Sequence, residues 1–304
     1  MALRTTQGDC GVNKHDMRHD LVPIQSNYKR KSVTMMRYNA TQAMKARRDA
    51  IRSLCNTEKY RGNFGAGQGH SSIISTDHKS MIYCPVPKAG WSTWKRLFYR
   101  EHGVEHLMND TLHLGFQSQW SKAGLMLINN RQSNQRITNR MVFVRNPYDR
   151  LVSAYSFKII QLSSRGPCKP TEVKPGLITF PQFVQCVIAR ADEGHQTNPK
   201  GGYGGQLDYH YRPQTLLCDF CSTDYNIIGH TEHMDEDIIE SLKVLNMTYI
   251  TSLRENASPR NNNTLSYWYS QMSGELLEAV QGLYSKDFEL LGYSKDTFTR
   301  TAIY

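Results

Sequence analysis

The sequence has neither a long hydrophobic run nor the apolar core of a signal peptide. No window of the 304 residues approaches the ~18 to 20 apolar residues that a membrane-spanning helix needs, and the N-terminus is polar and basic. We therefore expect no membrane anchor or export signal in the chain as given. The hydrophobic content of 39% still supports a substantial core, in one large domain or two small ones.

Cysteine is also scarce. Seven cysteines in 304 residues are too few for a fold held mainly by disulfides. Cys218 and Cys221 form one C-x-x-C, and the lack of a second such pair disfavours a four-cysteine zinc site. We predict a structural role for this pair, with a member bonded to a cysteine elsewhere in the chain.

The two standard sequence marks of a magnesium-dependent nucleoside triphosphatase are missing. The sequence contains no G-x-x-x-x-G-K-[ST] loop and no accompanying strand that ends in a metal-binding Asp. Their absence disfavours a nucleotide kinase, and the sequence gives no reason to expect bound Mg²⁺.

Positive charge is in excess. With 37 Lys and Arg against 27 Asp and Glu, the formal net charge is +10, which favours anionic partners without choosing among nucleotides, nucleic acids and acidic sugars. Five N-x-[ST] sequons begin at Asn39, Asn109, Asn246, Asn256 and Asn262, and the clustering of the last three favours the lumen of the secretory pathway.

Strands and helices alternate along the chain. Residues 80–86 and 141–145 are predicted to be buried strands that lead directly into helices, and 224–230 is a third short strand followed by a helix. This order predicts an α/β fold with three α/β/α layers and a mostly parallel central sheet, whose ligands bind at the carboxyl ends of the strands. We divide the chain into a flexible basic arm, 1–45, and a catalytic domain, 46–304.

The first strand-to-helix loop reads PKAGWST. Lys88 stands at its start, Gly90 is its only glycine, and Ser92 or Thr93 is the expected cap of the following helix. The unpaired N–H groups and the dipole of a helix N-terminus favour an anion, and a lysine can reach the same anion. Taken alone, the loop is equally compatible with an ordinary turn and a surface lysine.

The second loop reads VRNPYDRLVSAY. Arg145 leaves the strand, Asn146 and Pro147 are a favoured helix cap and first helical residue, and Ser153 lies further along the helix. Arginine suits a terminal phosphate because its guanidinium binds two oxygens at once. Two basic loops, with Lys88 and Arg145 57 residues apart, would hold two phosphates of one nucleotide. A nucleotide with 5′ and 3′ phosphates that needs no metal is 3′-phosphoadenosine 5′-phosphosulfate (PAPS).

These motifs resemble a known family. PKAGWSTWKR is similar to the 5′-phosphosulfate loop of the Golgi carbohydrate sulfotransferases, and VRNPYDRLVSAY is similar to their 3′-phosphate motif. HKSMIYCPVPK, TFPQFVQ, DYHYRPQTLLCDFCSTDYNIIGHTE and LYSKDFELLGY resemble the branch of the chondroitin and dermatan 4-O-sulfotransferases and the HNK-1 sulfotransferase, in order from about residue 47 to 294. The chain departs from the family pattern at Trp91, Thr93, Tyr211 and His230.

The resemblance implies a PAPS-dependent sulfotransferase with a P-loop-like fold that transfers the sulfuryl group to a sugar hydroxyl. Lys88 would stabilise the departing phosphate, and His210 is the candidate general base, with Asp208 and Glu232 as alternatives. The residues expected to bind PAPS are Pro87, Lys88, Ala89, Gly90, Trp91, Ser92 and Thr93 in the first loop, and Arg145, Asn146, Pro147, Tyr148, Asp149, Arg150, Leu151, Val152 and Ser153 in the second.

The expected acceptor is a glycosaminoglycan or another anionic glycan rather than a nucleic acid. Arg212, Lys200, Lys95 and Arg96 are candidate contacts to it. The branch favours the 4-O position of GalNAc in chondroitin or dermatan chains, and leaves the 3-O position of glucuronic acid open. The resemblance also implies the Golgi lumen or membrane. The alternative is a non-catalytic protein that binds anionic glycans and retains the fold, which Trp91 favours and the intact Lys88 and Arg145 oppose.

Overall fold

The computed structural model describes residues 38–60, 72–75, 81–104, 125–128, 137–161, 168, 178–197, 207–247 and 262–296. These residues fall within a compact unit that begins at Tyr38. Helix α1, Ala40–Cys55, begins inside the range expected to be an arm, and the division of the chain at residue 45 stays a prediction. No described helix is both long and apolar enough to cross a bilayer.

The described strands form a five-stranded sheet in the order β3-β1-β2-β4-β5. Their bounds are β1 Ser72–Ser75, β2 Met81–Cys84, β3 Leu125–Ile128, β4 Asn139–Val144 and β5 Ile227–His230. β2, β4 and β5 pair in parallel, whereas β1 runs antiparallel to both β2 and β3. Four of these five strands therefore point the same way, which confirms the predicted α/β class with a mostly parallel sheet.

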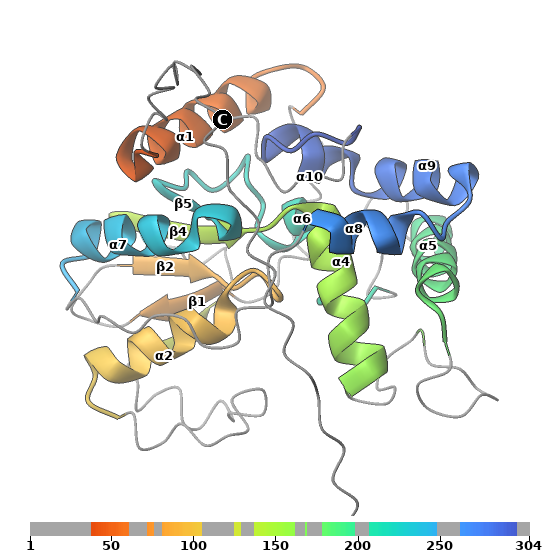
Figure 1. Ribbon diagram of the computed structural model, residues 1–304. Coiled ribbons are helices and arrows are strands. Elements are labelled where there is room, and N and C mark those ends of the chain that lie inside the picture. The colour runs from red at the N-terminus through yellow and green to blue at the C-terminus, as the bar shows by residue number, and fades with distance from the viewer. Residues whose placement is uncertain are drawn as a thin grey trace, which may run out of the picture. The chain divides into compact units, whose positions relative to one another are not determined.

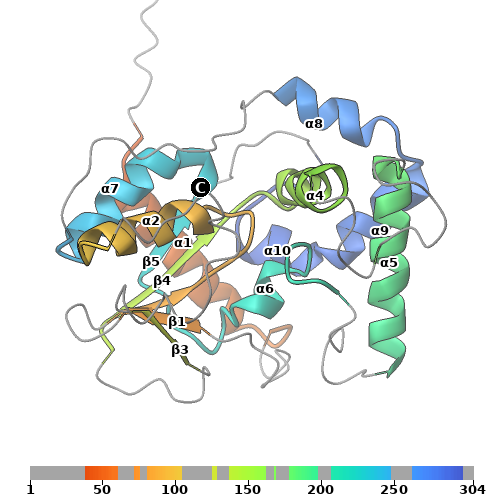
Figure 2. The ribbon, with the colours of Figure 1, turned by 90° about the horizontal axis from the view of Figure 1, so that it is seen from below.

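Helices cover both faces of this sheet. They are α2 Trp91–Glu101, α4 Pro147–Tyr155, the π-helix η4 Ser156–Gln161, α5 Phe180–Thr197, α6 Gln214–Leu217, the short η5 Thr231–His233, α7 Met234–Val244, α8 Asn262–Tyr269, α9 Gly274–Leu283 and α10 Ser285–Leu290. In Figures 1 and 2, α2 and α7 lie together over the strands, apart from the group of α4, α5, α8 and α9.

The alternation of side chains along β4 explains the two helical layers. Met141 and Phe143 point into a core with α2 and α7, whereas Val142 and Val144 point into a larger core with α4, α5, α9 and α10. Successive residues of a strand face opposite sides of the sheet, so a strand that is apolar throughout needs cover on both. This arrangement is the three-layer architecture expected from the sequence.

Helix α1 joins the edge of the sheet through a buried ion pair. The Nη1 of Arg47 donates to Asp237 Oδ2 over 2.6 Å and to the carbonyl of Ile228 over 2.9 Å. Tyr38 donates its hydroxyl to the other carboxylate oxygen of Asp237. Removal of one partner of a buried charge pair strongly destabilises a folded protein. This contact therefore fixes α1 against β5 and α7.

Disulfides link segments that are distant in sequence. Cys84 at the end of β2 is bonded to Cys218, and Cys55 at the end of α1 is bonded to Cys221. Cys168 and Cys186 form a third bond. The predicted structural role of the C-x-x-C is confirmed, and both of its cysteines pair elsewhere rather than with each other.

Candidate active site

The loop between β2 and α2 turns through a left-handed glycine. Gly90 has φ of 83°, and a Cβ at this position would lie 2.3 Å from Cε of Met234. Helix α2 begins directly after it, at Trp91, with no hydrogen bond from a capping side chain. The expected cap at Ser92 or Thr93 is therefore wrong: both residues lie in the first turn, because the chain already enters the helix at Gly90. The N-terminus of α2 therefore presents backbone N–H groups without a capping side chain, and such a helix end can bind an anion.

Trp91 packs inward. Its ring centroid lies 5.5 Å from that of Tyr83 in the core under α2, and Nζ of Lys95 lies 5.3 Å from the indole. Lys95 is only 6% exposed, and burial lowers its pKa to about 8. The indole of Trp91 thus belongs to the packing between α2 and β2. Lys95, expected to contact a glycan at the surface, is instead buried.

Lys88 occupies a strained and crowded position. Its backbone has φ of 68°, which non-glycine residues seldom adopt outside functional loops. Its Nζ lies 4.2 Å from the ring centroid of Phe157. Burial, reinforced by the charges of Arg145, Lys158 and Arg150, lowers the pKa of Lys88 to about 8. An extra negative charge beside this ammonium would relieve the repulsion among the cations.

The second loop contacts the first one directly. Arg145 donates from Nη1 to the carbonyl oxygen of Lys88 over 3.0 Å and from Nε to Asp149 Oδ2 over 2.6 Å. The side chain of Asn146 accepts from the N–H of Tyr148, and Pro147 is the first residue of α4, so the predicted cap of this helix is confirmed. Both basic loops therefore meet at the carboxyl ends of neighbouring parallel strands.

Arg150 connects two stretches of backbone. Its guanidinium, 1% exposed, donates to the carbonyl oxygens of Pro87 over 3.0 Å, Arg212 over 2.7 Å and Tyr209 over 2.9 Å. Arg150 was expected to bind the donor, but its described contacts are with backbone. Its position indicates that it fixes the first loop against residues 207–213.

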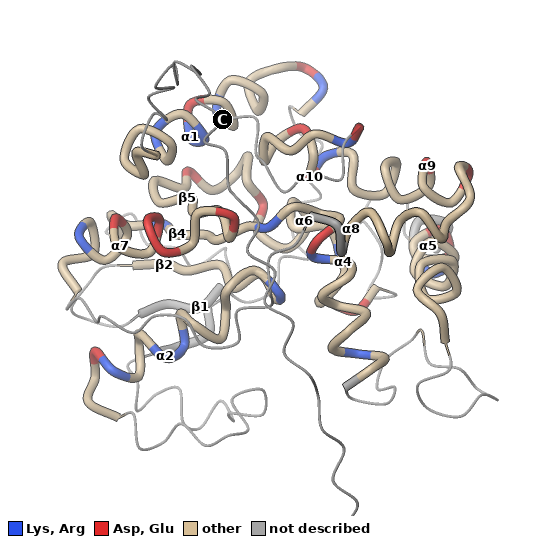
Figure 3. Tube along the Cα trace, in the orientation of Figure 1, with Lys and Arg blue, Asp and Glu red and all other residues tan. Residues whose placement is uncertain are grey.

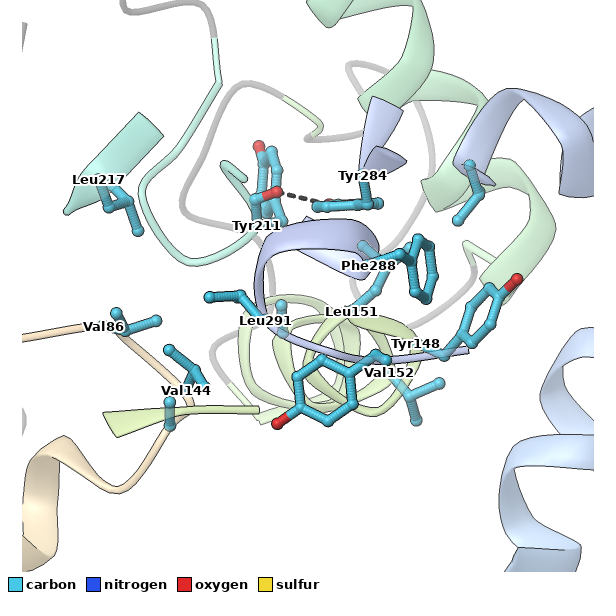
Figure 4. Packing of buried hydrophobic residues seen from close by; sticks show 14 of the residues in the cluster. Val86, Val144, Tyr148, Leu151, Val152, Tyr211, Leu217, Tyr284, Phe288 and Leu291 are labelled. Atoms are coloured by element: carbon cyan, nitrogen blue, oxygen red, sulfur yellow. Dashed lines mark hydrogen bonds between the residues drawn. The ribbon is translucent and has the colours of Figure 1, made fainter. Parts of the chain in front are cut away.

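The other residues expected in the second motif lie along α4. Tyr148, Leu151 and Val152 are packed in the larger core, as Figure 4 shows, and Ser153, the next residue of α4, is half-buried. Lys88, Arg145 and Asp149 therefore lie where the two loops meet. The apolar residues of the motif pack in the core and fix α4.

His210 lies beside this meeting point. Its Nδ1 is 2.7 Å from Asp208 Oδ1, and its ring is 5.3 Å from that of Phe157. Burial lowers the pKa of His210, against the opposing effect of Asp208, so the neutral imidazole is favoured. When Nδ1–H donates to Asp208, Nε2 is left as the acceptor nitrogen, as a general base requires. Phe157 is in contact with both Lys88 and His210.

Several residues at the site were not predicted from the sequence. Phe157 and Lys158 come from the π-helix η4, which continues α4. Gln214 accepts from the backbone N–H of Arg145 over 3.0 Å and donates to its carbonyl over 2.9 Å. Asp287 of α10 in turn accepts from the backbone N–H of Gln214 over 2.7 Å. Phe157 and Lys158 stand outside the sequence motifs, whereas Gln214 and Asp287 stand in blocks shared with the family, but their roles depend on partners far away in the sequence.

The chain is similar to known proteins of one family. A model described as the sulfotransferase family matches residues 71–294, which include both loops and His210. The chain belongs to the sulfotransferase family. The chain is similar to mouse carbohydrate sulfotransferase 12, with 25% identity over 262 residues, covering 73% of the chain and 60% of the relative.

Two further relatives carry related names. Carbohydrate sulfotransferase 10 of Xenopus laevis is 22% identical over 302 residues, covering 91% of the chain and 81% of the relative. Mouse carbohydrate sulfotransferase 8 is 26% identical over 287 residues, covering 84% of the chain and 64% of the relative. The chain thus spans less than two thirds of the length of two of these three relatives. No solved structure is significantly similar to it.

Two of the positions where the chain departs from the family pattern, Tyr211 and His230, are buried. Tyr211 packs edge-on against Phe183, and His230 stacks on Tyr293 at the end of β5. Burial holds the pKa of His230 well below its usual value, so this imidazole is neutral. Both departures therefore change packing behind the loops.

The other residues proposed as a base or as glycan contacts have structural contacts or lie elsewhere. Glu232 accepts the N–H of Asn146 over 2.9 Å and the hydroxyl of Tyr293 over 2.9 Å, so its carboxylate supports the second loop. Arg212 is buried and donates to the carbonyl of Leu207. Lys200 lies outside the described residues. Helix α2 carries Lys95, Arg96 and Arg100, as the blue segments of Figure 3 show.

No group of three or more His, Cys, Asp or Glu residues in the described part of the chain could hold a metal ion. The expected independence from metals stays a prediction.

Proposed function

We propose that this protein is a PAPS-dependent carbohydrate O-sulfotransferase. The observation that carries the proposal is the contact between the two basic loops. Lys88 and Arg145 meet at the carboxyl ends of β2 and β4, beside a helix N-terminus without a capping side chain and beside His210. Anions bind in parallel α/β folds at this edge of the sheet.

The residues of both loops suit a doubly phosphorylated donor. The turn at Gly90 brings the backbone N–H groups of Gly90 to Thr93 to one helix end, and Lys88 adds a positive charge with a lowered pKa. We assign the 5′ end of PAPS to Pro87–Thr93 and the 3′ phosphate to Arg145 and Ser153. Asn146 to Val152 would act by fixing the backbone that presents these two side chains. When bound, PAPS would supply an activated sulfuryl group.

Lys88 and His210 would divide the chemistry between them. The Lys88 ammonium would stabilise negative charge on the phosphate oxygen that leaves sulfur, which is the use of preorganised charge that contributes most to many enzymes. His210 would accept the proton of the sugar hydroxyl at Nε2 while Asp208 holds Nδ1. Phe157, which lies against both side chains, would keep water away from the pair.

The proposed acceptor is a glycan with acidic groups. Three relatives are carbohydrate sulfotransferases by name, and the net charge of +10 favours an anionic chain over a neutral one. Within this class we propose the 4-O position of GalNAc in chondroitin or dermatan as the first candidate. The 3-O position of glucuronic acid is the second candidate, which the sequence blocks shared with the HNK-1 branch favour.

We further propose that the protein works in the Golgi lumen. Its three disulfides favour an oxidising compartment, because thiols in the cytosol are kept reduced. The sequon residues Asn39 and Asn246 are exposed, as a glycosylation site must be. Glycosidase treatment of the protein secreted from cultured cells, followed by mass measurement, tests this: glycans at these asparagines are expected.

Transfer of radiolabelled sulfate tests the activity itself. The purified protein is incubated with labelled PAPS and separate desulfated chondroitin, dermatan and heparan acceptors, and the products are digested to disaccharides. Label at O-4 of GalNAc would support the first candidate, and label on glucuronic acid the second. PAPS binding without label in any glycan would favour the non-catalytic glycan-binding alternative.

A further inference from the structure

Lys158, Asp208 and the proposed base His210 are joined in a row by an ion pair and a hydrogen bond. Nζ of Lys158 lies 2.8 Å from Asp208 Oδ2, and Nδ1 of His210 lies 2.7 Å from Asp208 Oδ1. The three side chains are only 11% to 13% exposed. The backbone N–H of His210 also donates to Asp208 Oδ1 over 2.9 Å. One carboxylate therefore bridges a fixed cation and the imidazole.

The π-helix explains how Lys158 reaches this place. Helix α4 ends at Tyr155 and continues as η4, Ser156–Gln161, without a break in the chain. A π-turn contains an extra residue, so it changes the direction of the side chains that follow, and such turns are frequent at functional sites. Here the turn presents Phe157 to Lys88 and His210, and Lys158 to Asp208 and to the ring of Tyr209.

We infer that Lys158 is a positioning residue of the sulfotransferase, which anchors Asp208 and keeps the His210 imidazole neutral and correctly oriented as the base. The inference rests on the proposed function for the role of His210 as a base. The geometry that supports it is independent of any ligand: the ion pair fixes one oxygen of Asp208, and the other oxygen is then held on Nδ1. Nothing in the sequence motifs assigns a role to Lys158.

The charges around His210 set the direction of the effect. Asp208 comes from its own loop, Lys158 from the π-helix and Lys88 from the first loop, while Arg150 of α4 holds the neighbouring backbone of Tyr209. Burial lowers the pKa of His210 most, Asp208 raises it, and Lys158 and Lys88 lower it. Although burial opposes it, hydrogen bonds from His210 and Lys158 hold the pKa of Asp208 below its usual value, so this carboxylate stays ionised.

These signs predict opposite shifts for two neutralising substitutions. Lys158→Met removes a cation that opposes protonation, so the pKa of His210 rises. Asp208→Asn removes the anion that favours protonation, so the pKa of His210 falls. We expect each shift to be about 0.5 to 1 pH unit. Lys158→Arg retains the charge and should restore the original titration.

The test is an NMR titration of the His210 ring in the full chain without added nucleotide, its signal assigned by its loss in His210→Gln. Lys243→Met serves as the matched control, because Lys243 is exposed on α7 and pairs only with Glu240 among the described residues. Thermal unfolding of each variant checks that it is folded. Lys243→Met should leave the His210 titration in place.

Opposite shifts, restored by Lys158→Arg, would support the inference. The inference would be overturned if Lys158→Met and Asp208→Asn shifted the His210 pKa in the same direction, or if folded Lys158→Met showed no shift. The titration needs no glycan acceptor, so its result is separate from the fate of the proposed function. If label transfer occurs, the acid limb of the kcat/KM profile should move to higher pH in Lys158→Met and to lower pH in Asp208→Asn.

Discussion

Arg145 donates a hydrogen bond from Nη1 to the carbonyl oxygen of Lys88 over 3.0 Å, although the two residues are 57 positions apart. The bond joins the loop after β2 to the loop after β4, and those strands are parallel neighbours. Since Asp149 fixes the Nε side of the same guanidinium, the arginine has one orientation relative to both loops. A ligand that spans the loops thus meets a preformed pair of cations.

Removal of Arg145 should weaken nucleotide binding. We expect Arg145→Ala to raise the Kd for 3′-phosphoadenosine 5′-phosphate about 10- to 150-fold, because a hydrogen bond to a charged group contributes about 1.5 to 3 kcal/mol. Calorimetric titration measures it. Arg190→Ala is the control, since Arg190 pairs with Glu193 on the exposed side of α5 and should have no effect. Equal affinity of wild type and Arg145→Ala would contradict the assignment of the second loop.

Lys88 should set the alkaline limit of activity. Its pKa is about 8, and the proposed role needs the charged form, so kcat/KM should fall as the pH rises through that value. Lys88→Arg should remove this fall, because a guanidinium stays protonated throughout the pH range of the assay, up to about pH 12. Lys88→Ala should lower kcat about 10²- to 10³-fold, as loss of an oxyanion-stabilising group does. An alkaline limb that persists unchanged in an active Lys88→Arg variant would exclude Lys88 as its source.

Gly90 should not tolerate a side chain. The left-handed φ predicts that Gly90→Ala lowers the free energy of unfolding by about 1 to 2 kcal/mol, and the Cβ contact of 2.3 Å with Cε of Met234 adds a smaller steric part, because this atom ends a flexible side chain. Chemical denaturation measures the loss. Addition of Met234→Ala should recover only the steric part of it. Gly282→Ala, on α9, would place its Cβ where no atom lies within 4 Å, so it should instead be neutral or stabilising by up to about 1 kcal/mol. Equal effects at both glycines would refute this explanation of the turn.

The disulfide from β2 to the segment after α6 should matter more than the short-range one. Cys84 and Cys218 are separated by 134 residues, and Cys168 and Cys186 by 18. Because a bond that closes a longer loop restricts the unfolded chain more, we compare the two pairs in a chain in which Cys55 and Cys221, which enclose the first pair, are already alanine. In that chain we expect replacement of the first pair by alanine to cost about 4 to 5 kcal/mol and of the second about 3 kcal/mol. Urea unfolding compares them. A larger loss from the second pair would contradict the loop argument.

The sequence predicted the parts of the fold that depend on neighbouring residues. Apolar runs identify β2, β4 and β5, and Asn146-Pro147 identifies the start of α4. Strands β1 and β3 were not predicted, because they are held by antiparallel pairing, β1 with β2 and β3 with β1, which no local motif marks. Asn262–Tyr269 is a helix, although the asparagines at its start are typical of a polar loop.

The same limit applies to the site. Lys88, Arg145 and His210 stand in recognisable motifs, and the structure brings them together through Phe157 and the loop contact. Gln214 stands in a block shared with the family, but its role in holding the backbone of Arg145 was not predicted because its partner lies 69 residues away. Lys158 was missed for a different reason: a regular α-helix was expected at its position, and the π-turn that redirects its side chain has no sequence mark.

The central claim is that Lys88 and His210 act on a sulfate donor held by the two loops. Its most direct measurement is transfer of label from radiolabelled PAPS to desulfated chondroitin or dermatan by the wild type, Lys88→Ala and His210→Ala. Binding of 3′-phosphoadenosine 5′-phosphate is measured in parallel. We predict transfer by the wild type and a loss of at least about 100-fold in both variants, with His210→Ala still binding the nucleotide. Near-normal turnover by either variant, or no transfer by a wild-type protein that binds the nucleotide, would contradict the account.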